Sequence, residues 1–405
     1  MSGFSIRWMV ALLLILLVGG SFFYCEYLIY FPAILKCAWP QGKSAEGRAD
    51  GTEVRAMVLS DTHLLGAVGG HWFDKLRREW QMERAFQTAL WLLKPEIVFI
   101  LGDIFDEGKW SSQKVTSLSL FVMMMMMRMV MVMHWEDDVR RFHRMFRHAS
   151  DTELVVLVGN HDIGFHYEMD WFKLQRFEKV FNASSTRIVT KKGVNFLLLN
   201  SVALHGDGCP ICQAVETELI RLSGEMNCSL QSSDGGPAEG CNGSKLYSPS
   251  PPIMLQHYPL YRVSDAGCTG LDAAPAEDRH LLFREKYDVL SKEASQRLLW
   301  WFKPRLILSG HTHSGCEVLH DNKYPEISVP SFSWRNRNNP SFIMVSVSVD
   351  SYALSKCFLP EESTVINVYC LAGACMMLLF LAHCLWMKGL LQCLSLVVLG
   401  KHKSL

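Results

Sequence analysis

The sequence predicts an α/β domain placed between two membrane-spanning helices, and three observations support this. Short apolar runs that end in turn-forming polar residues recur through the middle of the chain, as is typical of buried strands. A helical pattern separates the first two runs, as expected where strands and helices alternate. Two long apolar stretches lie near the chain ends, and each is long enough to cross a bilayer.

The composition limits the class of protein. The chain has 405 residues with 40 basic and 40 acidic side chains, and 49% of its residues are hydrophobic. This length allows one large domain with a full core, or two smaller ones. Zero formal net charge gives no support for a nucleic-acid-binding protein, which usually carries a basic surface. No nucleic acid is therefore expected as a partner.

The first apolar stretch predicts a transmembrane helix over residues 8–35. A cytosolic N-terminus at residues 1–7 would precede it, and a lumenal linker at residues 36–53 would follow it. A cleaved signal peptide is the alternative. The length of the stretch and the aromatic residues near its end, as at a membrane interface, favour a span.

The second apolar stretch predicts another transmembrane helix over residues 365–387, because uninterrupted apolarity over that length favours a span over a buried helix. Arg7 and the basic tail at residues 388–405 place both ends in the cytosol by the positive-inside rule. The domain predicted over residues 54–358 then lies in the lumen. The final KHKSL resembles a dilysine retrieval signal that coat proteins read, although it could be a generic basic tail.

Glycosylation sequons and cysteines suit a lumenal domain. Sequons begin at Asn182, Asn227 and Asn242, all between the predicted spans. Disulfides are permitted in that compartment, although the sequence does not assign pairs. The CxxC motif could be a redox or zinc site, but a local disulfide is favoured. The cysteines expected in the lumen are Cys37, Cys209, Cys212, Cys228, Cys241, Cys268, Cys316 and Cys357.

Metal-binding side chains follow the predicted strands. In α/β folds, functional groups gather just past the carboxyl ends of strands. Carboxylate, imidazole and amide donors without thiolates suit manganese, iron or zinc rather than a closed structural zinc site. The residues are Asp61 and His63 after VRAMVLS, Asp103 and Asp106 after EIVFIL, Asn160 and His161 after ELVVLV, His257 after PIMLQ, and His311 and His313 after RLIL.

The donor set indicates a centre with two metal ions. The two oxygens of Asp103 could bridge a pair of ions, and ions about 3.5–4 Å apart can hold the attacking and leaving oxygens of a phosphoryl transfer. The pair His311 and His313, taken alone, could be ordinary surface. Ligand histidines must be neutral, so we expect activity to fall in acidic compartments.

In order, the motifs DTH, GDIFD, GNHD, a single histidine and GHTH resemble the signature of the calcineurin-like metallophosphoesterases. The resemblance implies a sandwich of two central β-sheets flanked by helices. It implies that His161 faces the scissile phosphate and that Asp106 orients its ring. It also implies two sets of metal ligands, namely Asp61, His63, Asp103 and His313 for one ion, and Asp103, Asn160, His257 and His311 for the other.

Longer stretches, such as GNHDIGFHYEM and PSFSWRNRNNPSFIM, resemble the animal metallophosphoesterases that remodel glycosylphosphatidylinositol (GPI) anchors. The resemblance implies manganese-dependent removal of ethanolamine phosphate from the second mannose of GPI. It implies location at endoplasmic reticulum exit sites, the ER-Golgi intermediate compartment and the cis-Golgi, with GPI-anchored proteins as substrates and cargo receptors that sort them. The alternatives are a phosphodiesterase for another lumenal phospholipid or nucleotide, and a non-catalytic cargo-binding protein.

Residues 111–134 depart from the family pattern because methionine dominates part of this stretch. A third span is excluded, because it would place Asp103 and His161 on opposite sides of the bilayer. Methionine can bind copper, but it mostly fills space. We expect an unpacked insertion, similar to translated repetitive DNA, that contributes nothing to catalysis.

The segment from Trp334 to Arg337, Trp-Arg-Asn-Arg, has two open interpretations. Its arginines could bind a phosphate through planar bidentate contacts, and its tryptophan could stack on a sugar. The same side chains could equally stabilise a loop.

Overall fold

The computed structural model describes residues 3–41, 53–66, 69–110, 134–204, 209–233 and 247–401. These residues form two units, of which one contains the chain ends, Met1–Pro32 and Pro360–Leu405, and the other is the α/β domain, Ala33–Leu359. Nearly all of the methionine-rich stretch lies outside the described residues. A helix over residues 134–145 follows it.

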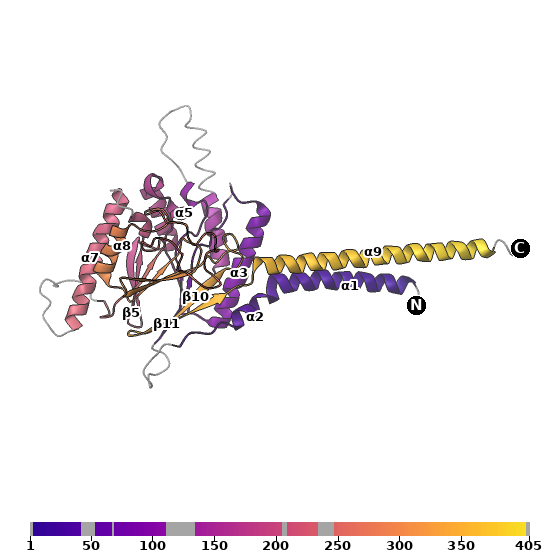
Figure 1. Ribbon diagram of the computed structural model, residues 1–405, viewed down its shortest axis with the longest axis horizontal. Helices are drawn as coiled ribbons and strands as arrows, with labels where there is room; N and C mark the ends of the chain where they lie inside the picture. The colour runs from indigo at the N-terminus through magenta and orange to yellow at the C-terminus, as the bar shows by residue number, and fades with distance from the viewer. Residues whose placement is uncertain are drawn as a thin grey trace, which may run out of the picture. The chain divides into compact units, whose positions relative to one another are not determined.

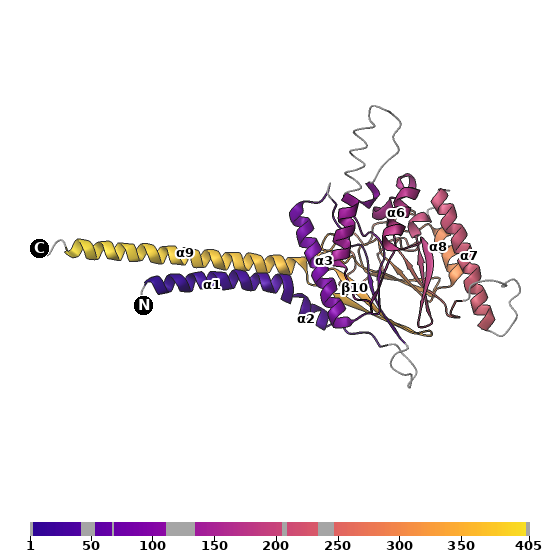
Figure 2. The ribbon, with the colours of Figure 1, turned by 180° about the vertical axis from the view of Figure 1, so that it is seen from behind.

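The terminal unit consists of apolar helices. Helices α1 (Gly3–Phe23) and α9 (Glu362–Lys401) pack side by side, with the two chain ends at the same end of the pair (Figures 1 and 2). The stretches Trp8–Leu35 and Glu362–Gly389 are long and apolar enough to cross a membrane, and only 6% and 11% of an 18-residue apolar window in each is buried. The core helix of a soluble protein would be mostly buried, so this exposure is what lipid-facing helices require.

The first helix continues beyond α1 through a π-helical turn, Tyr24–Leu28, into α2, Tyr30–Leu35. The Tyr369 hydroxyl on α9 donates a hydrogen bond to the Glu26 carboxylate. A polar contact of this kind between apolar helices fixes how they are rotated against each other.

The domain is a sandwich of two mixed β-sheets, as the family resemblance implied. Their strand orders are β11-β10-β1-β2-β3 and β4-β5-β6-β7-β9-β8. Strands β1, β2 and β3 run parallel, as do β5, β6, β7 and β9. Strands β10 and β11 in the first sheet, and β4 and β8 in the second, pair antiparallel. The strands of the first sheet are β1 (Val54–Leu59), β2 (Ile97–Ile100), β3 (Glu153–Val156), β10 (Ser341–Val347) and β11 (Tyr352–Phe358). Those of the second are β4 (Thr186–Lys191), β5 (Val194–Leu199), β6 (Ile253–Gln256), β7 (Leu306–Ser309), β8 (Cys316–His320) and β9 (Tyr324–Ser328).

The core lies between the two sheets. Alternate residues of each strand point inward, so Val58 and Phe99 of the first sheet join Phe196 and Leu308 of the second in one buried apolar cluster. The rings of Phe99 and Phe196 meet across the gap at 4.9 Å between centroids. Helix α3 covers the outer face of the first sheet, and α7 and α8 cover that of the second (Figures 1 and 2).

The sequence pattern correctly predicted the helix between the first two strands, now α3 (Trp72–Leu93). The His71 ring accepts a hydrogen bond from the Phe73 N–H at its start, and Lys94 takes a left-handed conformation at its end, directly before Pro95. The other helices are α5 (Asn160–Ile163), α6 (Trp171–Phe181), α7 (Pro210–Ser233) and α8 (Lys292–Phe302), with short 3-10 turns at Gly108–Trp110, His166–Glu168 and Ser201–Ala203.

The cysteines divide sharply between the two units. Disulfides join Cys37 to Cys357, Cys209 to Cys212 and Cys268 to Cys316, and Cys228 is disulfide-bonded as well. The CxxC motif is therefore a local disulfide. The free cysteines of the described residues all lie in the apolar helices, namely Cys25, Cys370, Cys375 and Cys384. This division is typical of a domain that folds in an oxidising compartment.

The disulfide between Cys37 and Cys357 joins positions 320 residues apart, close to both ends of the domain. Replacing both cysteines with serine should lower the free energy of unfolding of the domain by about 2–5 kcal/mol, because the unfolded chain then gains freedom. Denaturant unfolding of the full-length protein in detergent measures this change. The control, Cys384→Ser, removes a free thiol, and an equal midpoint for both proteins would contradict the expectation.

Candidate metal centre

The predicted metal-binding residues follow the ends of five parallel strands and lie close together in space. Strands β1, β2 and β3 end next to each other in the first sheet, and β6 and β7 do so in the second. The donor atoms of these residues approach within 4.8 Å of one another in overlapping groups. The structure therefore brings together Asp61, His63, Asp103, Asn160, His257, His311 and His313, which are far apart in the sequence.

Asp61, His63 and His313 form the first group. Nε2 of His63 lies 3.1 Å from Nε2 of His313 and 3.9 Å from Oδ1 of Asp61. Nε2 of His313 lies 3.6 Å from the same oxygen. Asp61 and His63 are buried, whereas the His313 side chain is 35% exposed, so the group opens to solvent beside His313.

Asp103, Asn160, His257 and His311 form the second group. Nε2 of His257 lies 3.0 Å from the Asn160 side-chain oxygen and 3.4 Å from Oδ2 of Asp103. The same Asp103 oxygen lies 3.5 Å from Nε2 of His63 in the first group. Asp103 thus stands between the two groups, where a bridging carboxylate would be needed.

Hydrogen bonds at the outer ring nitrogens orient three of the histidines. A neutral imidazole that donates from one nitrogen presents a lone pair at the other. Each ring is therefore held in the tautomer that a metal ligand needs. The bonds run from His63 Nδ1 to Asp106 Oδ1 (3.1 Å), from His257 Nδ1 to the Leu101 carbonyl (2.8 Å) and from His311 Nε2 to the Tyr287 carbonyl (3.0 Å).

Acceptor atoms converge at the centre of both groups. Nε2 of His63 faces Nε2 of His313, and Nε2 of His257 faces the Asn160 oxygen. With the outer nitrogens protonated, such pairs repel each other unless a proton or a cation lies between them. Oδ1 of Asp61 is buried without a hydrogen-bond partner in the described part of the chain. The donor set fits two divalent cations.

The backbone around the centre is held in unusual conformations. Asp61, His63, Asp103, His311 and His313 all have positive φ, between 43° and 69°. A non-glycine residue in this region costs energy, and such residues cluster at functional sites. The turns place each side chain at a strand end, pointing into the shared centre.

Glycines beside the ligands allow this close approach. Gly102 has φ +94°, and a Cβ there would lie 2.8 Å from Nδ1 of His257. A Cβ on Gly159 would overlap Oδ1 of Asp103, and one on Gly310 would overlap the Ser60 hydroxyl. No larger residue fits at these positions without moving the metal-binding side chains.

Asp162 ties two ligand loops together, a role that the sequence analysis did not predict. Its Oδ1 accepts hydrogen bonds from the backbone N–H groups of Ile104 and Phe105, each at 3.0 Å. Its Oδ2 accepts one from the Gly159 N–H at 2.7 Å. The buried carboxylate thus fixes the loop after β2 against the loop after β3. The only signal in the sequence is the position of Asp162 in the GNHD motif.

Asp106 holds two rings at the rim of the centre. Nδ1 of His161 donates to the backbone carbonyl of Asp106 at 3.0 Å and lies 3.5 Å from its carboxylate. The carboxylate is closer to His63, at 3.1 Å. The family resemblance implied the contact with His161 but not the one with His63. The His161 side chain is 29% exposed, so it can meet a molecule that enters from solvent.

The residues from Trp334 to Arg337 do not share one role: some stabilise loops, and one could contact a substrate. Arg337 stabilises loops, because it donates to the carbonyl of His313 and the hydroxyl of Ser314. Trp334 is buried, so it does not offer a surface for stacking. Arg335 is 39% exposed, with Nη2 3.5 Å from Oδ2 of Asp106, and it lies at the rim of the centre.

Burial and nearby charges set the protonation of the metal-free centre. Burial lowers the pKa of His311 to about 3 and, together with His63, holds the pKa of His313 well below its usual range. Burial also acts to lower the pKa of His257, but the Asp103 carboxylate outweighs it and raises this pKa to about 9. Without metal, His257 therefore carries a proton at neutral pH, and a cation must displace it.

Known proteins resemble the chain over nearly all of its length. A family model described as calcineurin-like phosphoesterase matches residues 54–315. A Danio rerio protein called Metallophosphoesterase 1 is 58% identical over 397 residues, which cover 98% of this chain and 97% of that protein. Proteins of the same name from Gallus gallus and Rattus norvegicus are each 56% identical, over 91% and 93% of this chain and 89% and 90% of their own lengths.

Metal binding should release protons at neutral pH, because His257 must lose its proton to act as a ligand. The same competition should weaken metal binding as pH falls. Isothermal titration of the metal-free protein with Mn²⁺ at pH ~7, in buffers of different ionisation enthalpy, counts the protons released. Binding with no proton release would contradict the state assigned to His257.

Asp162→Asn should destabilise the domain and weaken metal retention, although it barely changes the shape of the side chain. The amide nitrogen cannot accept the Gly159 N–H bond, so we expect a loss of about 1–3 kcal/mol in the free energy of unfolding. Denaturant unfolding measures it, with the exposed Asp151→Asn as the matched control. Equal stability of the two variants would show that Asp162 does not hold the loops.

Proposed function

The chain belongs to the calcineurin-like phosphoesterase family, and we propose that it hydrolyses the ethanolamine phosphate side chain on the second mannose of GPI anchors. Membership makes the chain a phosphoester hydrolase with clusters of metal-binding histidines and aspartates. The proposal adds the substrate and the residue roles, and it concerns a reaction that promotes export of GPI-anchored proteins from the endoplasmic reticulum.

The position of Asp103 carries the catalytic part of the proposal. Its Oδ2 lies within 3.5 Å of a ring nitrogen in each group of donor atoms. One carboxylate shared by two convergent sets of acceptors is the arrangement of a two-ion centre that acts on phosphate. No position of the predicted ligand set is missing, which argues against a non-catalytic cargo-binding protein.

We assign two ligand sets that share Asp103. The donors are oxygen and imidazole nitrogen without thiolate, which suits Mn²⁺, our choice of metal. When bound, two such ions supply positive charge to the phosphate and make a water molecule more acidic. The first ion would be held by Asp61, His63, Asp103 and His313, and the second by Asp103, Asn160, His257 and His311.

His161 would act on the substrate directly. Its Nδ1 is committed to the Asp106 carbonyl, so Nε2 is the atom available to substrate. Burial lowers the pKa of His161, whereas an anionic phosphate beside the ring would favour the protonated form. The protonated Nε2 can donate a hydrogen bond to a phosphate oxygen and give its proton to the departing alkoxide.

Arg335 would contact the phosphate from the rim. Its guanidinium keeps only a 3.5 Å contact with Asp106 and is partly exposed, so it can turn toward an anion without leaving an unpaired buried charge. A planar guanidinium matches two phosphate oxygens at once.

The proposed setting is the lumen of the early secretory pathway. The division of cysteines into bonded and free groups supports an oxidising compartment for the domain. Asn182 and Asn227 of the sequons are exposed on the domain, and Asn242 lies outside the described residues. The proposed organisation is a cytosolic N-terminus at 1–7, a span at 8–35, a lumenal linker at 36–53, a lumenal domain at 54–358, a span at 365–387 and a cytosolic dilysine tail at 388–405.

His161→Asn should lower turnover at least about a hundredfold while the protein keeps its metal, because His161 moves a proton and is not a ligand. Elemental analysis of the purified full-length variant checks the metal, and release of ethanolamine phosphate from a phosphorylated trimannoside checks turnover. Full metal content with turnover close to that of the wild type would remove His161 from the mechanism.

Cells that lack the protein should accumulate GPI glycans that retain ethanolamine phosphate on the second mannose. Mass spectrometry of released GPI glycans measures this directly. Re-expression of the wild type should remove the extra group, and re-expression of His161→Asn should not. An unchanged glycan profile in the deficient cells would refute the proposed substrate.

A further inference from the structure

A groove of about 660 Å³ opens beside the metal centre, with His311 and His313 in its lining. Its other wall comes from the long connection at residues 258–291, called here the groove loop, which joins β6 to α8 and has no strand or long helix of its own. A groove of this size can hold a group much larger than a phosphate.

The groove loop is held rigidly. The disulfide from Cys268 to Cys316 attaches it three residues beyond His313. The Asp272 carboxylate forms an ion pair with Lys356 at 2.8 Å. Asn339 donates to the carbonyl of Leu271 at 2.8 Å. A wall fixed at several points is preformed, so a ligand does not have to order it on binding.

The groove offers polar groups that have no partner among the described residues. The Arg279 Nε donates to the Ala274 carbonyl at 2.6 Å, and its terminal nitrogens have no partner in the part of the chain that the structure describes. Asp278 is exposed and forms no ion pair with any described residue. The Nε of Arg337 is buried without a hydrogen-bond partner among the same residues.

Apolar side chains stand beside these polar groups. Leu271 and Leu281 line the groove although they are 80% and 61% exposed. A sugar is bound by charged and amide side chains that form hydrogen bonds with vicinal hydroxyls. Small apolar side chains beside them pack against the C–H faces of the ring. A nucleotide would need an open aromatic surface, but the ring of Phe283 has the Arg262 guanidinium 5.2 Å above it.

We propose that this groove binds the mannose residues of the substrate, with Arg279 and Asp278 as specificity-determining side chains. The inference rests on the proposed function and names the part of the protein that recognises the glycan. The phosphate then lies at the metal centre while the sugar occupies the adjoining groove. A phospholipid headgroup is the competing occupant.

Inhibition by a bare sugar tests the groove separately from the reaction. The readout is hydrolysis of bis-para-nitrophenyl phosphate, a small diester without sugar, by the full-length protein in detergent with Mn²⁺. Mannotriose without phosphate should inhibit the wild type competitively. Arg279→Ala and Asp278→Ala should raise the inhibition constant about tenfold or more, as expected when a hydrogen bond to a charged group is lost.

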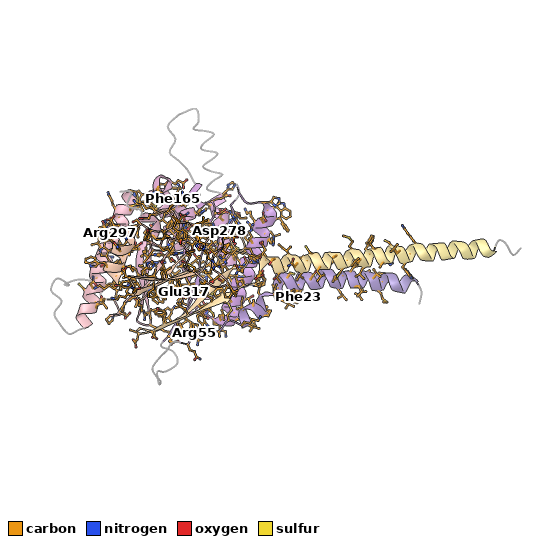
Figure 3. The ribbon with its side chains drawn as sticks, in the orientation of Figure 1. Phe23, Arg55, Phe165, Asp278, Arg297 and Glu317 are labelled. Atoms are coloured by element: carbon orange, nitrogen blue, oxygen red, sulfur yellow. A yellow bond between two sulfur atoms is a disulfide. The ribbon has the colours of Figure 1, made fainter. Side chains whose placement is uncertain are left out.

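The same variants should leave turnover of the small diester within about twofold of the wild type. Arg297→Ala is the matched control, because Arg297 lies on α8 at the edge of the domain, well apart from Asp278 (Figure 3). Thermal unfolding confirms that each variant is folded. A loss of small-diester turnover in both groove variants would mean that these residues act on the metal centre, and it would overturn the proposal.

Two further results would also overturn the proposal. One is a wild type that mannotriose does not inhibit, or groove variants that it inhibits as strongly as Arg297→Ala. The other is stronger inhibition by glycerophosphoethanolamine than by mannotriose, which would assign the groove to a phospholipid headgroup. If mannotriose inhibits but a trimannoside carrying ethanolamine phosphate is not hydrolysed, the groove inference stands and the proposed function fails.

Discussion

The charge of the Asp103 carboxylate, buried where the two sheets end, is the interaction on which the rest of the structure depends. A buried carboxylate is costly unless it is paired. Here Oδ1 accepts a hydrogen bond from the backbone N–H of His161 at 2.8 Å, and Oδ2 faces the rings of His63 and His257. His257 holds the pKa of Asp103 well below its usual range, although burial acts to raise it. Strand β2, which ends just before Asp103, is paired on both sides, with β1 and β3, and cannot shift without exposing this charge.

The sandwich explains why so many histidines can meet here. Parallel strands end at one edge, so β1, β2 and β3 present their following residues side by side, and β6 and β7 do the same in the facing sheet. The left-handed turns at Asp61, His63 and Asp103 then direct short side chains inward instead of along the strand. The stability of the apolar core between the sheets compensates for this strain, and bound cations would relieve the repulsion between the converging acceptors.

The sequence predicted β1, β2, β3, β6 and β7, because these buried parallel strands read as continuous apolar runs, and it placed the proposed ligands directly after them. It did not predict the other strands, among them β8, which mixes buried and exposed positions, and β10, which contains buried serines. Asp162 was also missed, because its carboxylate binds backbone N–H groups, which leave no pattern in a sequence. The pairing of Cys37 with Cys357 depends on proximity in space, which cysteine spacing does not encode.

Hydrogen bonds connect the groove loop to two residues of the metal centre, His311 and His313. The carbonyl of Tyr287 on the loop accepts the hydrogen bond that orients His311. Arg337 joins the carbonyl of His313 to that of Ala273 on the same loop. A movement of the loop would therefore rotate one metal-binding ring and pull on the backbone of another. These bonds to two of the proposed ligands suit a fixed wall better than a lid that opens.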